Sequence, residues 1–205
     1  MPEDAERITM LHGAGGTVMH DLIKNYIVKY LGGFSGLNMM DVSLEALDDA
    51  AAIGDIVLKS DSHAVKPIFF PGGDIGRLAV SGTVNDIAVL GAEPFALSCG
   101  LILEEGLSLS DLERILRSMR ETCIEAGVGV MTGDTKVVEK GSLGGCVVNI
   151  SGVGRRTDAL ESNLRVVKRF RKDFSSRWVL DSNLSAGDKI CLLYTSDAAD
   201  ELDGV

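Results

Sequence analysis

Acidic side chains at the ends of apolar runs are the residues of this 205-residue chain best suited to chemistry. Asp48 and Asp49 precede a β-rich stretch and Asp61 ends it, while Asp86 and Asp134 lie among small and apolar residues. Burying a lone carboxylate is costly, so acids in such places are normally paired, hydrogen-bonded or bound to a metal. Each one alone is more simply a cap or turn residue. Oxygen ligands suit Mg²⁺, which usually binds carboxylates together with phosphates. We therefore expect Asp49, Asp61, Asp86 and Asp134 to converge on one cleft.

A glycine-rich loop could supply contacts to phosphate. It reads His-Gly-Ala-Gly-Gly over residues 12–16 and precedes a predicted helix, where bare backbone N–H groups can approach an anion. Its spacing matches neither common phosphate-binding fingerprint, so a simple tight turn is the alternative. Lys136, two residues after Asp134, could place an ammonium group beside phosphate, although a lone lysine is more often solvated. Asn85 and Asp86 lie inside a predicted helix, either on an exposed stripe or facing a cavity.

The elements that must position these residues follow from apolar periodicity and capping signals. In chain order we expect a strand over 7–11, a helix over 22–31, a strand over 56–61, a helix from an Asp74 cap to Gly91, a strand over 95–103, a helix from a capping box at 110–113 to Gly127, and strands over 128–131 and 146–152 on either side of residues 132–136. Strands and helices do not alternate strictly, as they would in a doubly wound sheet. The predicted class is α+β, with a mixed sheet, helices on one face, and an opposite apolar face that favours dimerisation.

Composition narrows the class of protein. With 45% hydrophobic residues the chain can bury a substantial core. A net charge of −10 argues against nucleic acid or an anionic membrane as a partner. The sequence has no apolar run of about 18 residues and no secretory signal, so we expect a cytoplasmic protein that does not span a membrane. Its four cysteines are widely separated, which indicates neither a zinc site nor a disulfide framework.

Residues 155–189 differ from the rest of the chain in charge. They carry nine Lys or Arg against five Asp or Glu, a local net charge of +4 that leaves −14 for the remainder. A solvated connector between domains is the simpler interpretation, and a docking surface for an acidic partner is the alternative. Apolar residues in the segment need a covering surface, among them Leu160, Leu164, Phe170 and Trp178, and we expect these to be partly exposed or loosely docked.

Taken together, these stretches resemble the PurM-like ATP-binding superfamily, and their sequences are most similar to those of its HypE family of hydrogenase maturation factors. The matching segments are residues 8–16, 44–51, 59–62, 69–77, 82–88, 91–94 and 132–138, a nearly continuous coverage from residue 7 to about 154. Phe-Phe-Pro-Gly-Gly-Asp at 69–74 and Thr-Gly-Asp-Thr-Lys-Val-Val at 132–138 carry the resemblance most specifically. The acidic pair at 48–49 and the Asn-Asp pair occur across the superfamily.

The resemblance implies a PurM-like N-terminal ATP-binding domain over residues 1–154. It further implies a homodimer whose sheets pair into a barrel, with ATP and Mg²⁺ bound near the interface. HypE-like proteins use ATP to dehydrate a protein thiocarboxamide to a thiocyanate, which donates the cyanide ligand in [NiFe]-hydrogenase maturation. The implied partners are a carbamoyltransferase and an iron-scaffold maturation factor.

The resemblance also implies a role for each matching residue. Lys136 would act at the reacting group, as the catalytic residue. The nucleotide would be bound by His12, Gly13, Gly15, Gly16, Asn85, Asp86, Gly133, Asp134 and Thr135, and Mg²⁺ by Asp48, Asp49, Asp61, Asp86 and Asp134. Asp48 stands where the family often has Glu, a mild departure.

The end of the chain departs further from the family pattern. Family members continue with a second domain, whereas Gly-Asp-Lys-Ile at 187–190 is followed here by fifteen residues. We expect residues 155–190 to be a basic connector and the start of an absent second domain, and residues 191–205 to be a non-native read-through tail. Cys191 is then not the carbamoyl-accepting cysteine of the family, and this chain would bind ATP and dimerise without completing the reaction.

Two alternatives stay open at this point. One keeps the fold and changes the substrate, as in thiamine-phosphate kinase or selenophosphate synthetase, although the segment at 69–77 argues against it. The other is a non-enzymatic role, in which the domain docks other maturation factors.

Overall fold

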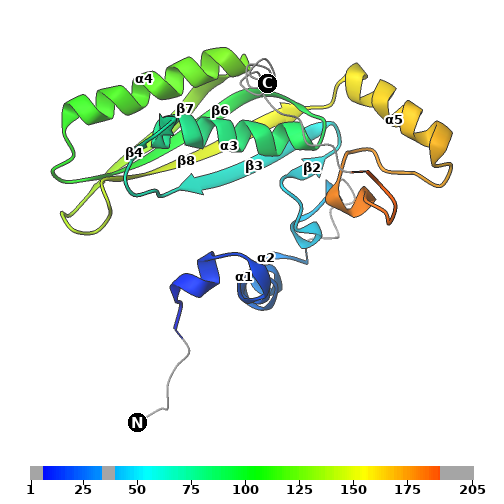
Figure 1. Ribbon diagram of the computed structural model, residues 1–205, viewed down its shortest axis with the longest axis horizontal. Coiled ribbons are helices and arrows are strands. Elements are labelled where there is room, and N and C mark those ends of the chain that lie inside the picture. The colour runs from blue at the N-terminus through cyan, green and yellow to red at the C-terminus, as the bar shows by residue number, and fades with distance from the viewer. Residues whose placement is uncertain (1–6, 34–39, 190–205) are drawn as a thin grey trace, which may run out of the picture.

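The computed structural model describes residues 7–33 and 40–189, and its central feature is a sheet of six strands in the order β1-β2-β3-β8-β6-β7 (Figure 1). The strands are β1 (Met40–Val42), β2 (Ala51–Ile53), β3 (Ile56–His63), β6 (Glu93–Glu104), β7 (Gly129–Val138) and β8 (Cys146–Arg155), and a separate hairpin joins β4 (Phe69–Phe70) to β5 (Gly73–Asp74). β6 and β7 are parallel, and the other neighbouring pairs are antiparallel. The predicted union of the strands near 61, 95–103 and 146–152 in one mixed sheet is confirmed.

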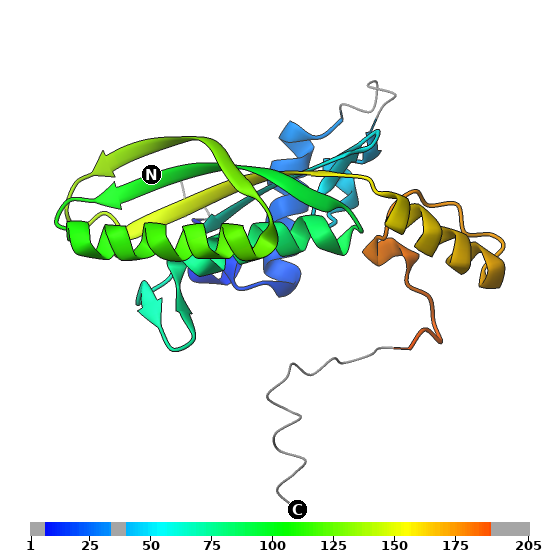
Figure 2. The same cartoon turned by 90° about the horizontal axis from the view of Figure 1, so that it is seen from above.

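Two long helices, α3 (Ile75–Val89) and α4 (Leu109–Ala126), cover one face of this sheet (Figure 1 and Figure 2). The burial pattern of β8 gives the reason. Its residues alternate between buried and partly exposed, because successive side chains of a strand point to opposite faces. Cys146, Val148 and Ile150 are buried in the core that the helices cover. The α+β class with helices on one face is confirmed.

α3 begins where the sequence predicts. The Asp74 carboxylate accepts hydrogen bonds from the N–H groups of Gly76 (2.8 Å) and Arg77 (3.1 Å), an N-cap that satisfies two otherwise unpaired donors. A Cβ atom at Gly76 would lie 2.5 Å from the Ile115 carbonyl oxygen. Only glycine therefore allows α3 and α4 to approach so closely at this point.

The start of α4 differs from the prediction of a capping box at residues 110–113. The N-cap is Ser108, whose hydroxyl accepts a hydrogen bond from the N–H of Asp111 (3.0 Å), so the helix begins at Leu109. Two serines close together can each cap, and the earlier one is used. The predicted end is confirmed at Gly127, which has a φ of 68° that glycine adopts without strain.

The N-terminal segment also differs from the prediction. Residues 7–11 do not form a strand, because the chain turns back at Thr9 and the 3-10 helix η1 (Met10–Gly13) follows. The next helical segment is continuous and consists of α1 (Gly16–Leu22), η2 (Ile23–Val28) and α2 (Lys29–Leu31). It begins earlier than predicted, and none of these described residues is buried. Its apolar stripe therefore does not face the core.

The C-terminal part of the described chain packs more tightly than predicted. It contains α5 (Asp158–Phe170) and η4 (Asp181–Asn183) and lies beyond one end of the sheet (Figure 2). Leu160, Leu164 and Trp178 are 3%, 2% and 1% exposed, so the expectation of loose docking is wrong for these residues. They form a second core with residues of β1, β2, β3 and α3, because the domain itself supplies the covering surface.

The predicted read-through tail at 191–205, with Cys191, lies outside the described residues. A short 3-10 helix, η3 (Leu44–Ala46), completes the described elements. No helix within residues 7–33 and 40–189 combines the length and apolar composition needed to cross a membrane.

Trp178→Ala should lower the free energy of unfolding by about 3–5 kcal/mol, because it empties the centre of the second core. Urea denaturation followed by circular dichroism measures the change. Phe170→Ala is the matched control, since Phe170 is 84% exposed and its removal should change stability by at most about 0.5 kcal/mol. Equal losses in the two variants would contradict the intramolecular packing of this segment.

Candidate functional site

Lys59 of β3 lies between two of the predicted acids. Its Nζ atom lies 2.6 Å from Asp86 Oδ2 on α3, and the two side chains are 20% and 27% exposed. The same Nζ atom donates a hydrogen bond to the carbonyl oxygen of Asp49, just before β2 (2.8 Å). One ammonium group therefore ties β3 to α3 and to the segment before β2. Asp86 faces the sheet, whereas Asn85 is exposed. The interpretation as an exposed stripe therefore applies to Asn85 and not to Asp86.

Asp61 lies two residues from Lys59 on the same face of β3 and pairs with His63. His63 Nε2 lies 3.4 Å from Asp61 Oδ2. α3 passes directly over this pair, since a Cβ atom at Gly82 would lie 2.9 Å from His63 Nε2 and 3.3 Å from Asp61 Oδ2. Gly82 and Asp86 are four residues apart and share one face of the helix. Asp61 and Asp86 therefore meet at one interface between β3 and α3.

Lys59, which lies in the matching segment 59–62, and His63, which follows it, are assigned no role by the sequence motifs, although their spacing carries a signal. Positions 59, 61 and 63 of a strand share a face, and basic residues on either side of a half-buried acid offset its charge. The Nδ1 atom of His63 is buried and has no hydrogen-bond partner among the described residues. The two side chains make this interface more polar than the acids alone indicate.

Asp48 and Asp49 line a cavity of about 490 Å³ beside β3. Its other lining residues come from α1 and η2, from residues 43–51 and from β3: Gly16, Met19, His20, Ile23, Ser43, Leu44, Leu47, Ala50, Ala51, Leu58, Lys59 and Ser60. The Asp48 carboxylate accepts hydrogen bonds from the N–H groups of Asp49 (2.9 Å) and Asp181 (3.2 Å). Burial raises the pKa of the Asp48 carboxyl above its ordinary value, and the nearby Asp181 carboxyl adds to this.

The end of the glycine-rich loop reaches this cavity. Gly16 lines it, and Gly15 and Gly16 have φ values of 80° and 71°, which favour glycine. His12 lines a separate depression beside α1, and its ring Nδ1 accepts a hydrogen bond from the N–H of Thr9 (3.1 Å). Gly16, and not His12, is therefore placed toward the acidic residues.

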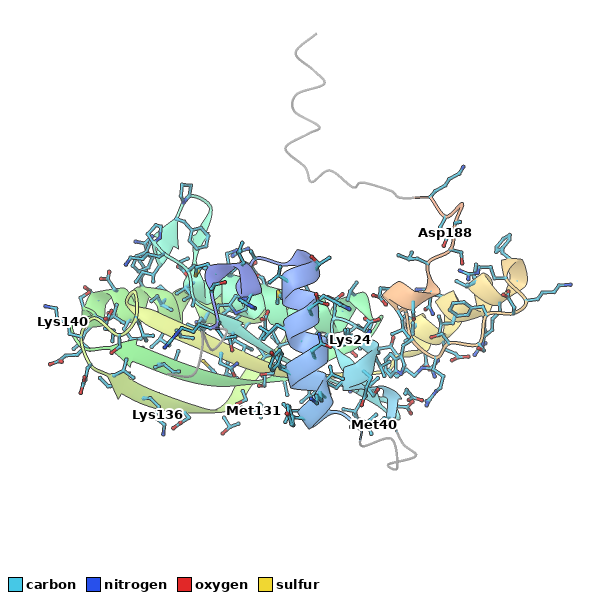
Figure 3. All side chains as sticks on the ribbon, turned by 90° about the horizontal axis from the view of Figure 1, so that it is seen from below. Lys24, Met40, Met131, Lys136, Lys140 and Asp188 are labelled. Carbon is cyan, nitrogen blue, oxygen red and sulfur yellow. The ribbon has the colours of Figure 1, made fainter. Side chains whose placement is uncertain are left out.

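Asp134 and Lys136 lie on β7, at the edge of the sheet, where Figure 3 labels Lys136. β7 runs through residues 132–136, so the prediction that the strand ends at residue 131 is wrong. Lys136 Nζ lies 3.1 Å from Asp134 Oδ2, and both side chains are about 70% exposed. The hydrogen bond from Lys136 lowers the pKa of Asp134 below its ordinary value.

The register of the sheet keeps Asp134 away from Asp61 within one chain. Asp61 pairs with Ile150 of β8, and Cys99 of β6 pairs with both Ile150 and Gly133 of β7. Three strand spacings, about 14 Å, separate these positions, and Asp134 points to the other face of the sheet from Gly133. Among the described residues no three His, Cys, Asp or Glu side chains are placed to hold a metal ion together. The prediction of one cleft with all four acids is therefore wrong for a single chain.

Glu104 organises the loop that follows β7, although no motif identifies it. Its carboxylate accepts hydrogen bonds from the N–H groups of Leu143 (3.2 Å), Gly145 (2.9 Å) and Gly141. The bond from Leu143, together with those from the two glycines, holds the pKa of Glu104 below its ordinary value. The carboxylate thereby fixes the connection between the edge strand and β8.

Comparisons with known proteins agree in pointing to one family. The family model described as AIR synthase related protein, N-terminal domain, matches residues 47–156. A hydrogenase expression/formation protein of Methanocaldococcus jannaschii is 54% identical over 152 residues, which are 72% of this chain and 44% of that protein. Carbamoyl dehydratase HypE of Azotobacter vinelandii is 46% identical over 147 residues, which are 72% of this chain and 42% of that protein. The chain thus spans less than half the length of these relatives.

Solved structures show the same likeness. A crystal structure of a HypE–HypF complex matches with a TM-score of 0.60 and 46% identity, covering 65% of this chain and 42% of that chain. A crystal structure of hydrogenase maturation protein HypE in complex with ATP matches with a TM-score of 0.50 and 44% identity, covering 72% of this chain and 43% of that chain.

Glu104→Gln should destabilise the domain at neutral pH and have a diminishing effect in acid. Because the folded-state pKa of Glu104 is depressed, its contribution is present above the ordinary value of 4.5 and is lost as the pH falls through the lower folded-state value. Unfolding midpoints of both proteins, measured from pH 7 downward, test this. Glu105→Gln, at an exposed neighbour, is the control. A pH-independent difference between Glu104→Gln and wild type would contradict the proposed charge effect.

Proposed function

The chain belongs to the AIR synthase related protein family through its N-terminal domain, and from this we propose that it binds ATP with Mg²⁺ as the N-terminal part of a HypE-type carbamoyl dehydratase. The observation that carries the proposal is the interface between β3 and α3, where Asp61 and Asp86 meet. Similarity to a HypE structure that contains ATP supports it.

The residues around this interface fit a metal-bound nucleotide. The neighbouring cavity, about 490 Å³, falls in the range of roughly 300–1,000 Å³ that is usual for small-molecule sites. Carboxylates are hard oxygen ligands of the kind that Mg²⁺ takes, and glycine N–H groups before a helix suit phosphate. The residues that would hold Mg²⁺ are Asp48, Asp49, Asp61 and Asp86, and those that would contact the nucleotide are Gly13, Gly15, Gly16 and Asn85.

ATP, when bound, would supply a phosphoryl group that turns the oxygen of a protein thiocarboxamide into a leaving group. The residues of this chain would position and neutralise charge. The carboxylates would orient the metal, and the Lys136 ammonium would stabilise negative charge at the reacting group. Lys136 would be the catalytic residue of the site.

We propose that Lys136 acts with Gly133, Asp134 and Thr135 on the site of a second copy of the chain. Within one chain these residues lie three strands from Asp61. A homodimer that pairs the uncovered faces of two sheets into a barrel would bring Asp134 and Lys136 of one copy toward the uncovered face of β3 in the other, where Leu58 and Ser60 line the cavity.

The uncovered face of the sheet supports such a dimer. Leu58 and Ile102 are 42% and 36% exposed on it, and exposed apolar patches commonly mark interfaces. Polar contacts order the same face, since Ser60 Oγ lies 3.0 Å from Ser151 Oγ and Asn149 donates a hydrogen bond to the Ser62 hydroxyl (2.8 Å).

The partners of the whole protein belong to the same proposal. Similarity to a HypE–HypF complex supports a carbamoyltransferase of the HypF type as the partner that delivers the carbamoyl group. An iron-scaffold maturation factor would accept the cyanide.

The 205-residue chain should bind ATP in the presence of Mg²⁺, and Asp61→Asn should weaken binding by at least about tenfold because the site loses a charged metal ligand. Isothermal titration calorimetry measures both affinities. Asp173→Asn, at an exposed position outside the site, removes the same charge and should bind like wild type. Absence of measurable ATP binding by the wild-type chain would contradict the proposed function.

Light scattering should show a mass of about twice 21.8 kDa at micromolar concentration, because the uncovered face is apolar. Leu58→Lys places a charge on that face and should yield a monomer. Leu184→Lys, at a position 74% exposed in the C-terminal segment, should remain a dimer. A monomeric wild type, or a dimeric Leu58→Lys variant, would argue against pairing through this face.

A further inference from the structure

We propose that Lys59 is a resident cation of the nucleotide site: its ammonium group takes the place, between the Asp86 carboxylate and the Asp49 carbonyl oxygen, that a further divalent cation would otherwise occupy. The inference rests on the proposed function and adds to it. It predicts how many metal ions accompany the nucleotide, which no motif in the chain reports.

The contacts of Lys59 are those of a cation held by oxygen ligands. Its Nζ atom lies 2.6 Å from Asp86 Oδ2 and 2.8 Å from the Asp49 carbonyl oxygen. One ligand is an anionic carboxylate and the other a backbone carbonyl, a combination that hard divalent cations also use. The described residues offer no group of three metal-binding side chains, and an ammonium group lies where two oxygen donors do converge.

Burial distinguishes this pair from an ordinary surface salt bridge. The side chains of Lys59 and Asp86 are 20% and 27% exposed, and they come from β3 and α3. In the Lys136–Asp134 pair both groups are about 70% exposed and lie two residues apart on one strand. An exposed pair of that kind contributes little and is screened by salt. The Lys59 ammonium is held between α3 and the residue before β2, and its side chain is largely shielded from solvent.

The charge of the site explains what a fixed cation does there. Asp48, Asp49, Asp61 and Asp86 are acidic, and a nucleotide polyphosphate is itself strongly anionic. Bringing the two together requires compensating positive charge, which metal ions and basic side chains can share. Lys59 supplies one such positive charge as part of the protein, whereas a metal ion must be taken up from solution. Replacing it with a neutral side chain frees two oxygen donors and leaves a charge deficit, and both effects favour uptake of one more Mg²⁺ with each ATP.

The test is the linkage between ATP binding and Mg²⁺ in wild type and Lys59→Met. ATP affinity is measured by equilibrium dialysis over a hundredfold range of free Mg²⁺ at constant ionic strength. A tenfold rise in free Mg²⁺ should increase the ATP association constant of Lys59→Met by about ten times more than that of wild type, which corresponds to one additional ion. Lys59→Arg, which keeps the positive charge, should retain the wild-type dependence.

Lys140→Met is the matched control for net charge, because Lys140 is exposed in the loop after β7. It should show the wild-type dependence on Mg²⁺. Lys59→Gln repeats the charge removal with a polar side chain in case the methionine variant does not fold. If both neutral variants keep the wild-type Mg²⁺ dependence, whatever their affinity, Lys59 is a structural tether and the inference fails. If the wild-type chain binds no ATP, the proposed function fails and takes this inference with it.

Discussion

The close approach of α3 to β3 and β8 is the constraint on which the rest of the structure depends. At Gly152 of β8 a Cβ atom would lie 2.6 Å from Ile87 Cδ1, and at Gly82 of α3 it would lie 2.9 Å from His63 Nε2. A side chain at either position would displace Ile87 or His63, or push the helix away from the sheet. Glycines on both sides therefore bring backbone and polar groups together where apolar side chains would normally fill the gap. This proximity puts Asp86 within reach of Lys59.

Such proximity has an electrostatic cost that the sequence meets locally. Two carboxylates at a half-buried interface repel each other and lose hydration, so each needs a compensating partner. Lys59 provides one for Asp86, and His63 provides one for Asp61. The alternation of β3 places both partners and Asp61 on the face that meets the helix. A single strand therefore carries Asp61 together with the two basic groups that offset the charges of Asp61 and Asp86.

Local signals in the sequence were sufficient for much of this interface. The Asp74 cap, the end of α4 at Gly127 and the existence of strand β6 follow from short-range chemistry that tertiary contacts do not override. The strand through residues 132–136 could not be predicted in the same way, since a Gly-Asp pair normally interrupts a strand. It is tolerated here because β7 is an edge strand that is exposed along most of its length.

The separation of Asp134 from Asp61 could not be predicted either. A motif gives the order of residues along the chain but neither the number of strands between them nor the face on which each one lies. Pairing β8 between β3 and β6 inserts a late segment of the chain between two earlier ones. Long-range pairing of this kind is set by the fit of whole strands, and one residue of register changes the face on which a side chain lies.

The basic segment shows the same limit for charge. Its excess of Lys and Arg suggested a connector or a docking surface, yet several of its guanidinium groups bind within the domain. Arg177 donates hydrogen bonds to Asp41 (2.9 Å) and Asp55 (2.7 Å), next to the buried Trp178.

Arg156 and Arg171 bind partners inside the basic segment itself. Arg156 pairs with Glu161 (2.6 Å), and Arg171 donates hydrogen bonds to the Asn183 carbonyl oxygen (2.7 Å) and the Ser185 hydroxyl (2.8 Å). Net charge counts residues without regard to their partners, so it overstates the charge that the surface presents. The acidic body of the domain and its basic segment meet at Arg177, whose two ion pairs help to hold the second core in place.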